Sequence, residues 1–68
     1  MAHYYVNTNA QPNGDHEVHT STRSYLPLSY NRLDLGEHLS CLTAVMQARL
    51  TYSQSNGCRW CSLLCHTG

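Results

Sequence analysis

The sequence predicts an α+β fold in which a small antiparallel sheet packs against one main helix. Two β-prone stretches lie near the N-terminus, at residues 4–8 and 17–20, with the turn signal Asn13-Gly14 between them. Further along, apolar residues recur at helical spacing over residues 41–54. Because neither a hairpin nor one amphipathic helix is stable alone, the two elements must share a buried face.

The first predicted element is a β-hairpin with a loose connection. Pro12 forbids a regular ladder between the two stretches, and both residues of Asn13-Gly14 tolerate positive φ. A third short strand is expected at Leu33-Asp34-Leu35, where apolar and polar residues alternate, and Gly36 is expected to end it. The predicted sheet therefore has two or three antiparallel strands.

The main helix is predicted from Cys41 to Gln54, with Ser40 as its N-cap. Its core-facing side is defined by residues spaced four, three and four apart, which are Cys41, Val45, Ala48 and Tyr52. Asn56-Gly57 accepts a left-handed conformation, so the helix is expected to end there. A last short helical turn is expected over Ser62-Leu63-Leu64.

The chain has 68 residues, which predicts a single small domain over residues 1–68. A domain of this size buries only about 60% of the surface that its unfolded chain exposes. Such small domains usually need a metal, a disulfide or a partner to stay folded. With one tryptophan and no phenylalanine, the five tyrosines must supply much of the core.

The charge pattern disfavours two classes of partner. The formal net charge is zero, lysine is absent, and the four arginines are spread along the chain. Nucleic-acid binding needs clustered positive charge, so it is disfavoured, and so is a basic membrane-binding patch. An unknown protein partner is the remaining expectation. Nothing in the sequence forms a catalytic constellation beyond the Cys58-x-x-Cys61 pair, so no enzymatic activity is expected.

The N-terminal segment lacks the basic start and apolar core of a secretory signal, and no apolar run is long enough to span a membrane. We therefore expect a cytoplasmic protein. Thiols stay reduced in the cytoplasm, which makes disulfides the weaker interpretation of the four cysteines.

Cys58-x-x-Cys61 is the sharpest local motif, because two thiolates at this spacing in a turn can bind one ion. The predicted ligands of one structural zinc are Cys58, Cys61, His19 and Cys65, with His66 as an alternative. Two other interpretations stay open, in which these cysteines pack as small apolar residues or form disulfides. Redox catalysis is the least favoured, because the pair follows the main helix and does not open one.

The segment Asp15-His16-Glu17-Val18-His19 superficially resembles the H-E-x-x-H motif of metalloproteases. That motif needs two histidines four residues apart on a helix, whereas His16 and His19 are three apart in a β-prone stretch. Alternation along a strand places these two rings on opposite faces, so both cannot bind one ion without a bulge.

Several segments together resemble a family of small bacterial proteins without an established activity. These segments are Tyr4-Tyr5-Val6-Asn7, Asn13-Gly14-Asp15-His16-Glu17-Val18-His19, Leu26-Pro27, Leu35-Gly36, Ser40-Cys41, Ala44-Val45 and Gly57-Cys58-x-x-Cys61. More distantly, the chain resembles the small zinc-binding modules attached to some bacterial nucleases and alkylation-repair proteins. That resemblance implies His19, Cys58 and Cys61 as ligands, but Arg23 occupies the fourth ligand position and an arginine cannot bind zinc.

The sequence thus supports three hypotheses about function. The first is a small non-catalytic protein with an interaction or structural role. The second is a zinc-binding module associated with nucleic acid, by analogy with the nuclease-linked modules. The third is a thiol redox protein.

Overall fold

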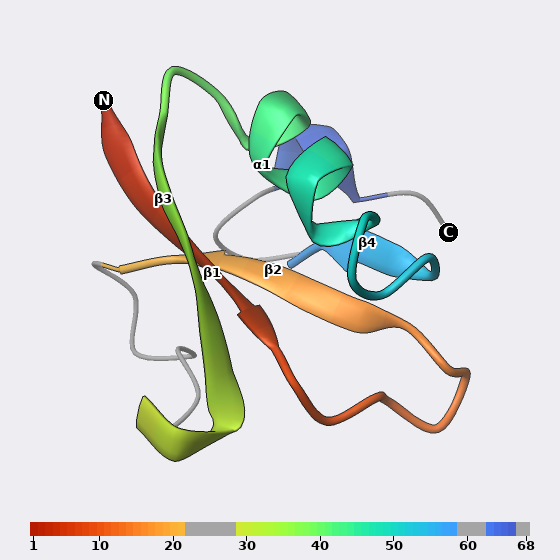
Figure 1. Cartoon of the computed structure of the whole chain (residues 1–68). Coiled ribbons are helices and arrows are strands. Elements are labelled where there is room, and N and C mark those ends of the chain that lie inside the picture. The colour runs from red at the N-terminus through yellow and green to blue at the C-terminus, as the bar shows by residue number, and fades with distance from the viewer. Residues whose placement is uncertain (22–28, 59–62, 67–68) are drawn as a thin grey trace.

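The computed structural model describes residues 1–21, 29–58 and 63–66. It confirms the α+β class. Its elements, in chain order, are β1 (Ala2–Asn7), β2 (His16–Thr20), the 3-10 turn η1 (Ser29–Asn31), β3 (Arg32–His38), α1 (Cys41–Ala48), β4 (Ser55–Gly57) and the 3-10 turn η2 (Leu63–Cys65). Figure 1 shows α1 packed on one side of a twisted sheet, with β4 beneath it.

The sheet is mixed and has the strand order β3-β1-β2-β4. β1 pairs antiparallel with both β2 and β3, which confirms the predicted hairpin. The expectation of a purely antiparallel sheet is wrong, because β4 adds to the other edge of β2 in parallel. Strands β2 and β3 both run antiparallel to β1, so they run in the same direction. Helix α1 connects β3 to β4, and β4 enters the sheet in that same direction.

The main helix is shorter than predicted, and it ends at Ala48 instead of Gln54. Arg49 to Tyr52 leave it through a turn in which the Tyr52 amide donates to the Ala48 carbonyl at 2.8 Å. The predicted cap, Asn56-Gly57, is part of β4 and pairs with β2. Because residues 55–57 pair with β2, the helical periodicity does not continue to Gln54. Tyr52 instead stacks on His16, with 4.0 Å between the two ring centroids.

Strand β3 continues beyond the predicted end at Gly36. The register between β1 and β3 shifts at Tyr4/Tyr5, and Gly36 adopts a φ of 78°. The Gly36 amide donates to the Asp34 carboxylate at 2.7 Å. Leu35 is the extra residue of this bulge, and the pairing with β1 resumes at Gly36 and continues through Glu37 and His38.

Replacing Gly36 with alanine is expected to lower the free energy of unfolding by about 1–2 kcal/mol, because a Cβ disfavours the left-handed conformation. No heavy atom lies within 4 Å of the added Cβ, so a steric clash does not contribute. Urea unfolding of the metal-free protein measures the change. Glu37→Ala, at the neighbouring exposed position, serves as the control and should stay within about 0.5 kcal/mol. Equal stability of the Gly36→Ala and wild-type chains would contradict the assigned backbone.

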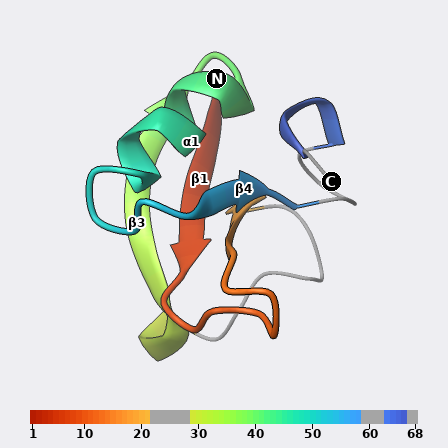
Figure 2. The ribbon, with the colours of Figure 1, turned by 90° about the vertical axis from the view of Figure 1, so that its right-hand side faces the viewer.

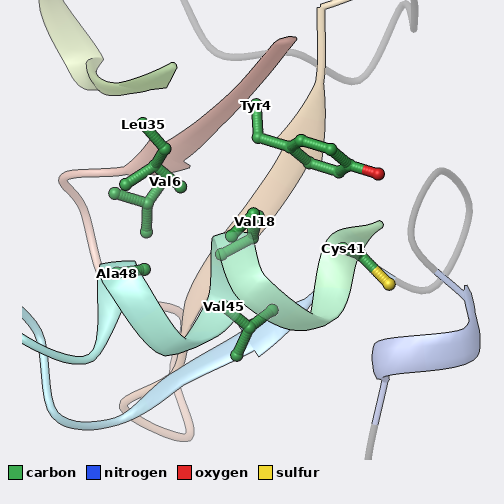
Figure 3. Close-up of a cluster of buried hydrophobic side chains, with 8 residues drawn as sticks. Tyr4, Val6, Val18, Leu35, Cys41, Val45 and Ala48 are labelled. Carbon is green, nitrogen blue, oxygen red and sulfur yellow. The ribbon is translucent and has the colours of Figure 1, made fainter. Parts of the chain in front are cut away.

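The core lies between the sheet and α1, and Figure 3 shows side chains from both layers meeting there. Its buried residues are Tyr4, Val6, Val18, Leu35, Cys41, Ala44, Val45 and Ala48. Val6 and Val18 are paired across the hairpin and have no exposed surface. Burying a side chain of this size contributes about 1.5–3 kcal/mol. The side of β2 that carries Val18 therefore faces the helix, and its neighbours Glu17 and His19 lie on the opposite side of the sheet.

A disulfide joins Cys41, at the start of α1, to Cys65 in η2, across a Cα–Cα distance of 6.1 Å. In Figure 3 the Cys41 sulphur points from α1 toward η2, and Figure 2 shows both elements at the same end of the molecule. The expectation that disulfides are the weaker interpretation is wrong for this pair.

Among the described residues, no helix has the length and apolar character needed to cross a bilayer.

Candidate metal centre

Strand β2 presents polar side chains on the face of the sheet away from α1. Because side chains alternate along a strand, Glu17 and His19 lie on the opposite side of β2 from Val18. Val18 is paired with Gly57 of β4, and the amide of the next residue, Cys58, donates to the Val18 carbonyl at 2.9 Å. The parallel pairing therefore places Cys58 beside His19.

These three side chains converge. One ligand atom from each of Glu17, His19 and Cys58 lies within 4.8 Å of the other two. His19 is 3% exposed and Cys58 is 2% exposed, while Glu17 is partly buried. The His19 Nε2 atom is 3.8 Å from the Glu17 Oε1 atom. A nitrogen, an oxygen and a sulphur donor thus meet at one shielded point on the sheet.

The spacing is close to that of a metal site. Zinc bonds of about 2.0–2.3 Å in a tetrahedron separate the ligand atoms by roughly 3.3–3.7 Å. The cluster, within 4.8 Å, must therefore contract by about 1 Å to hold an ion. The parallel register already aligns the backbone of β2 with that of β4, so the contraction would come from the side chains.

Electrostatics also suit a cation at this point. Burial lowers the pKa of His19 below its ordinary value of 6.5, because an imidazolium loses hydration there. His19 is therefore neutral at physiological pH, which is the form that binds metal. A metal-bound set of one carboxylate, one thiolate and one neutral imidazole carries two negative charges, which a divalent cation balances.

The lowered pKa of His19 predicts that the metal-free protein loses stability in acid. Below pH 6.5, the ordinary pKa, the unfolded chain takes up a proton that the folded chain refuses until the pH reaches the lowered value. The His19 contribution is thus fully present above about pH 6.5 and declines as the pH falls below it. Urea unfolding of wild type and His19→Gln between about pH 5 and 8 measures it. Parallel curves for the two proteins would contradict the buried, neutral ring.

The structure brings together only some of the ligands predicted from sequence. His19 and Cys58 lie in the cluster, whereas Cys61 is outside the described residues. Cys65 is bonded to Cys41, so its sulphur has no thiolate to offer a metal, and we remove it from the ligand set. The half-buried His66 donates a hydrogen bond from its Nδ1 atom to the Gly57 carbonyl at 3.0 Å. This bond ties the C-terminal turn to the residue just before Cys58.

Sequence reasoning missed Glu17. The signal was present, because a Glu-x-His pattern in a strand places both side chains on one face. The metalloprotease motif, which this segment does not match, gives no reason to expect Glu17 as a ligand. The other half of the centre depends on the parallel pairing of β4 with β2, which no local pattern indicated.

No protein-family model, no curated protein and no solved structure matches this chain. The likeness to zinc-binding modules therefore stays a prediction, and the candidate centre is supported by its own geometry.

Proposed function

We propose that this chain is a small non-catalytic zinc-binding module in which Glu17, His19 and Cys58 hold the metal. The observation that carries the proposal is the convergence of three donor atoms within 4.8 Å at a shielded point. Zinc suits the set because it accepts sulphur, nitrogen and carboxylate oxygen in one tetrahedron. Burial of His19 and Cys58 favours a structural ion over one that admits substrate.

A structural site needs a fourth ligand, and we propose Cys61 for that position. It follows Cys58 at the C-x-x-C spacing. Three residues separate their Cα atoms by at most about 11 Å, so Cys61 is tethered within reach of the cluster. His66 is the alternative fourth ligand from its place in the sequence; it is not among the donor atoms that lie within 4.8 Å of one another, and its Nδ1 atom is hydrogen-bonded to a backbone carbonyl. Histidine ligands typically make such a bond and bind metal through the other nitrogen.

The proposal does not extend to nucleic acid, because four scattered arginines and zero net charge provide no phosphate-binding surface. The cytoplasmic location also stays a proposal. The Cys41–Cys65 disulfide is more typical of oxidising compartments, and it weakens that expectation.

Native mass spectrometry of the chain with added zinc tests the function. We expect one zinc per wild-type chain, none on Cys58→Ser, and reduced occupancy on Glu17→Gln. Glu37→Gln removes an exposed carboxylate from β3 and is the matched control, with occupancy like wild type. Comparison of Cys61→Ser with His66→Gln identifies the fourth ligand. A wild-type chain without zinc, or a Cys58→Ser chain that keeps it, would overturn the proposal.

A further inference from the structure

The C-terminal turn η2 is fastened at two places, and one of them lies beside the proposed zinc ligand Cys58. Cys65 is bonded to Cys41, the first residue of α1. The next residue, His66, donates from its Nδ1 atom to the carbonyl of Gly57, the last residue of β4, at 3.0 Å. The turn therefore connects the helix with the strand that leads into the zinc centre.

The peptide unit between Gly57 and Cys58 is held from both sides. Its carbonyl accepts from His66, and its amide donates to the Val18 carbonyl of β2 at 2.9 Å. Because a trans peptide is planar and its N–H and C=O point in opposite directions, these two bonds fix the orientation of the plane. That orientation sets the direction in which the Cys58 side chain leaves the backbone. Since β4 ends at Gly57, His66 supports this peptide at the point where the strand stops.

Without the disulfide, the described contacts of η2 are weak. Leu64 is 98% exposed, and Cys65, which packs against the core, is only partly buried. The single bond from His66 to Gly57 contributes less than the ordering of several backbone residues costs. With Cys41 and Cys65 as separate thiols, η2 is therefore expected to be detached from β4 in most chains.

The disulfide can be attacked from solvent. Cys41 is 8% exposed, but Cys65 is partly exposed and lies next to the exposed Leu64. A small dithiol can therefore approach the bond from the side of η2. Exposed disulfides are typical of labile and regulatory bonds, whereas structural ones are usually shielded.

We propose that the Cys41–Cys65 disulfide sets the zinc affinity of the centre, so that reduction of this bond by a dithiol releases the metal. The inference rests on the proposed zinc function. The dithiol gives up two electrons and two protons, the S–S bond breaks into two thiols, and the dithiol becomes a disulfide. Detachment of η2 then removes the bond to Gly57, and the Cys58 sulphur is no longer held toward the other ligands.

The zinc affinity should fall in proportion to the fraction of chains that keep η2 in place. If about one reduced chain in ten does so, the apparent Kd rises about tenfold.

Competition for zinc against a chelating dye of known affinity tests the inference on three forms of the chain. These are oxidised wild type, wild type reduced by a dithiol and desalted without air, and Cys41→Ala/Cys65→Ala. We expect the second and third forms to bind zinc about tenfold more weakly than the first. The same dithiol treatment should leave the affinity of the double variant unchanged. Far-UV circular dichroism checks that each form is folded, and the reduced wild type provides the test by itself should the double variant fail to fold.

Equal zinc affinity of oxidised and reduced wild type would overturn the inference. Tighter binding after reduction would also overturn it, because Cys65 would then act as a zinc ligand. Zinc loss that occurs only together with loss of the circular-dichroism signal would do the same, since the release would then be global unfolding. Each of these results leaves the zinc proposal intact, whereas oxidised wild type that binds no zinc would overturn the zinc proposal itself.

Discussion

We expect zinc to raise the melting temperature of the disulfide-bonded wild-type chain by about 15–30 °C. A ligand that binds only the folded state stabilises it by about 4 kcal/mol at a free concentration one thousand times its Kd. In a domain of this size each kcal/mol corresponds to about 4–8 °C. The effect is large because Glu17, His19 and Cys58 converge only in the folded sheet. Thermal unfolding followed by circular dichroism, with zinc or with a chelator, measures the shift.

The ligand variants separate metal binding from packing. Cys58→Ser should melt at nearly the same temperature with zinc and with chelator, because a serine hydroxyl does not replace a thiolate. Glu17→Gln should show a reduced zinc shift, while Glu37→Gln keeps the full shift. The metal-free melting temperature of each variant reports any loss of packing separately. A wild-type curve that zinc does not move would reject a structural metal.

Loss of the Cys41–Cys65 disulfide is expected to lower the free energy of unfolding by about 3.5 kcal/mol. The bond links residues separated by 24 positions, and closure of a loop of this length restricts the unfolded chain by about that amount. Small domains have only about 5–15 kcal/mol in total, so the loss is a large fraction of the stability. Urea unfolding of Cys41→Ala/Cys65→Ala, with metal removed by chelator, measures it.

Reduction provides the internal control for the disulfide. A reductant should destabilise the wild-type chain by a similar amount and leave the double variant unchanged. Thiol titration of the unfolded, unreduced wild type should detect at most two of the four cysteines as thiols, since Cys41 and Cys65 are bonded to each other. Detection of four thiols in protein purified without reductant would contradict the bond.

The fold was predictable where local chemistry agrees with tertiary packing. The hairpin of β1 and β2 follows from β-prone residues around a turn, and Gly14 adopts a φ of 93° at that turn. The start of α1 at Cys41 follows Ser40 as predicted. The end of α1 was not predictable from sequence. Tyr52 fits the spacing of a helical face, but in the structure its ring stacks on His16. Residues 55–57 form a strand because they pair with the edge of β2 that β1 does not occupy.

The candidate centre was half predictable. His19 and Cys58 are residues of metal-binding type, and the C-x-x-C spacing marked Cys58. Cys65 has the same chemistry and similar spacing, yet it lies in η2 and bonds to Cys41 instead. Sequence gives residue types and local spacing, but the partner of each thiol depends on how α1, β4 and η2 are arranged in space.

Zinc-edge X-ray absorption spectroscopy on the purified, zinc-loaded chain tests the central claim most directly, because it reports the ligand atoms themselves. The proposed site predicts two sulphurs at about 2.3 Å and two nitrogen or oxygen atoms at about 2.0–2.1 Å. Cys58→Ser should abolish this spectrum. A zinc shell without sulphur, or one made of four sulphurs, would contradict a centre built on Glu17, His19 and Cys58.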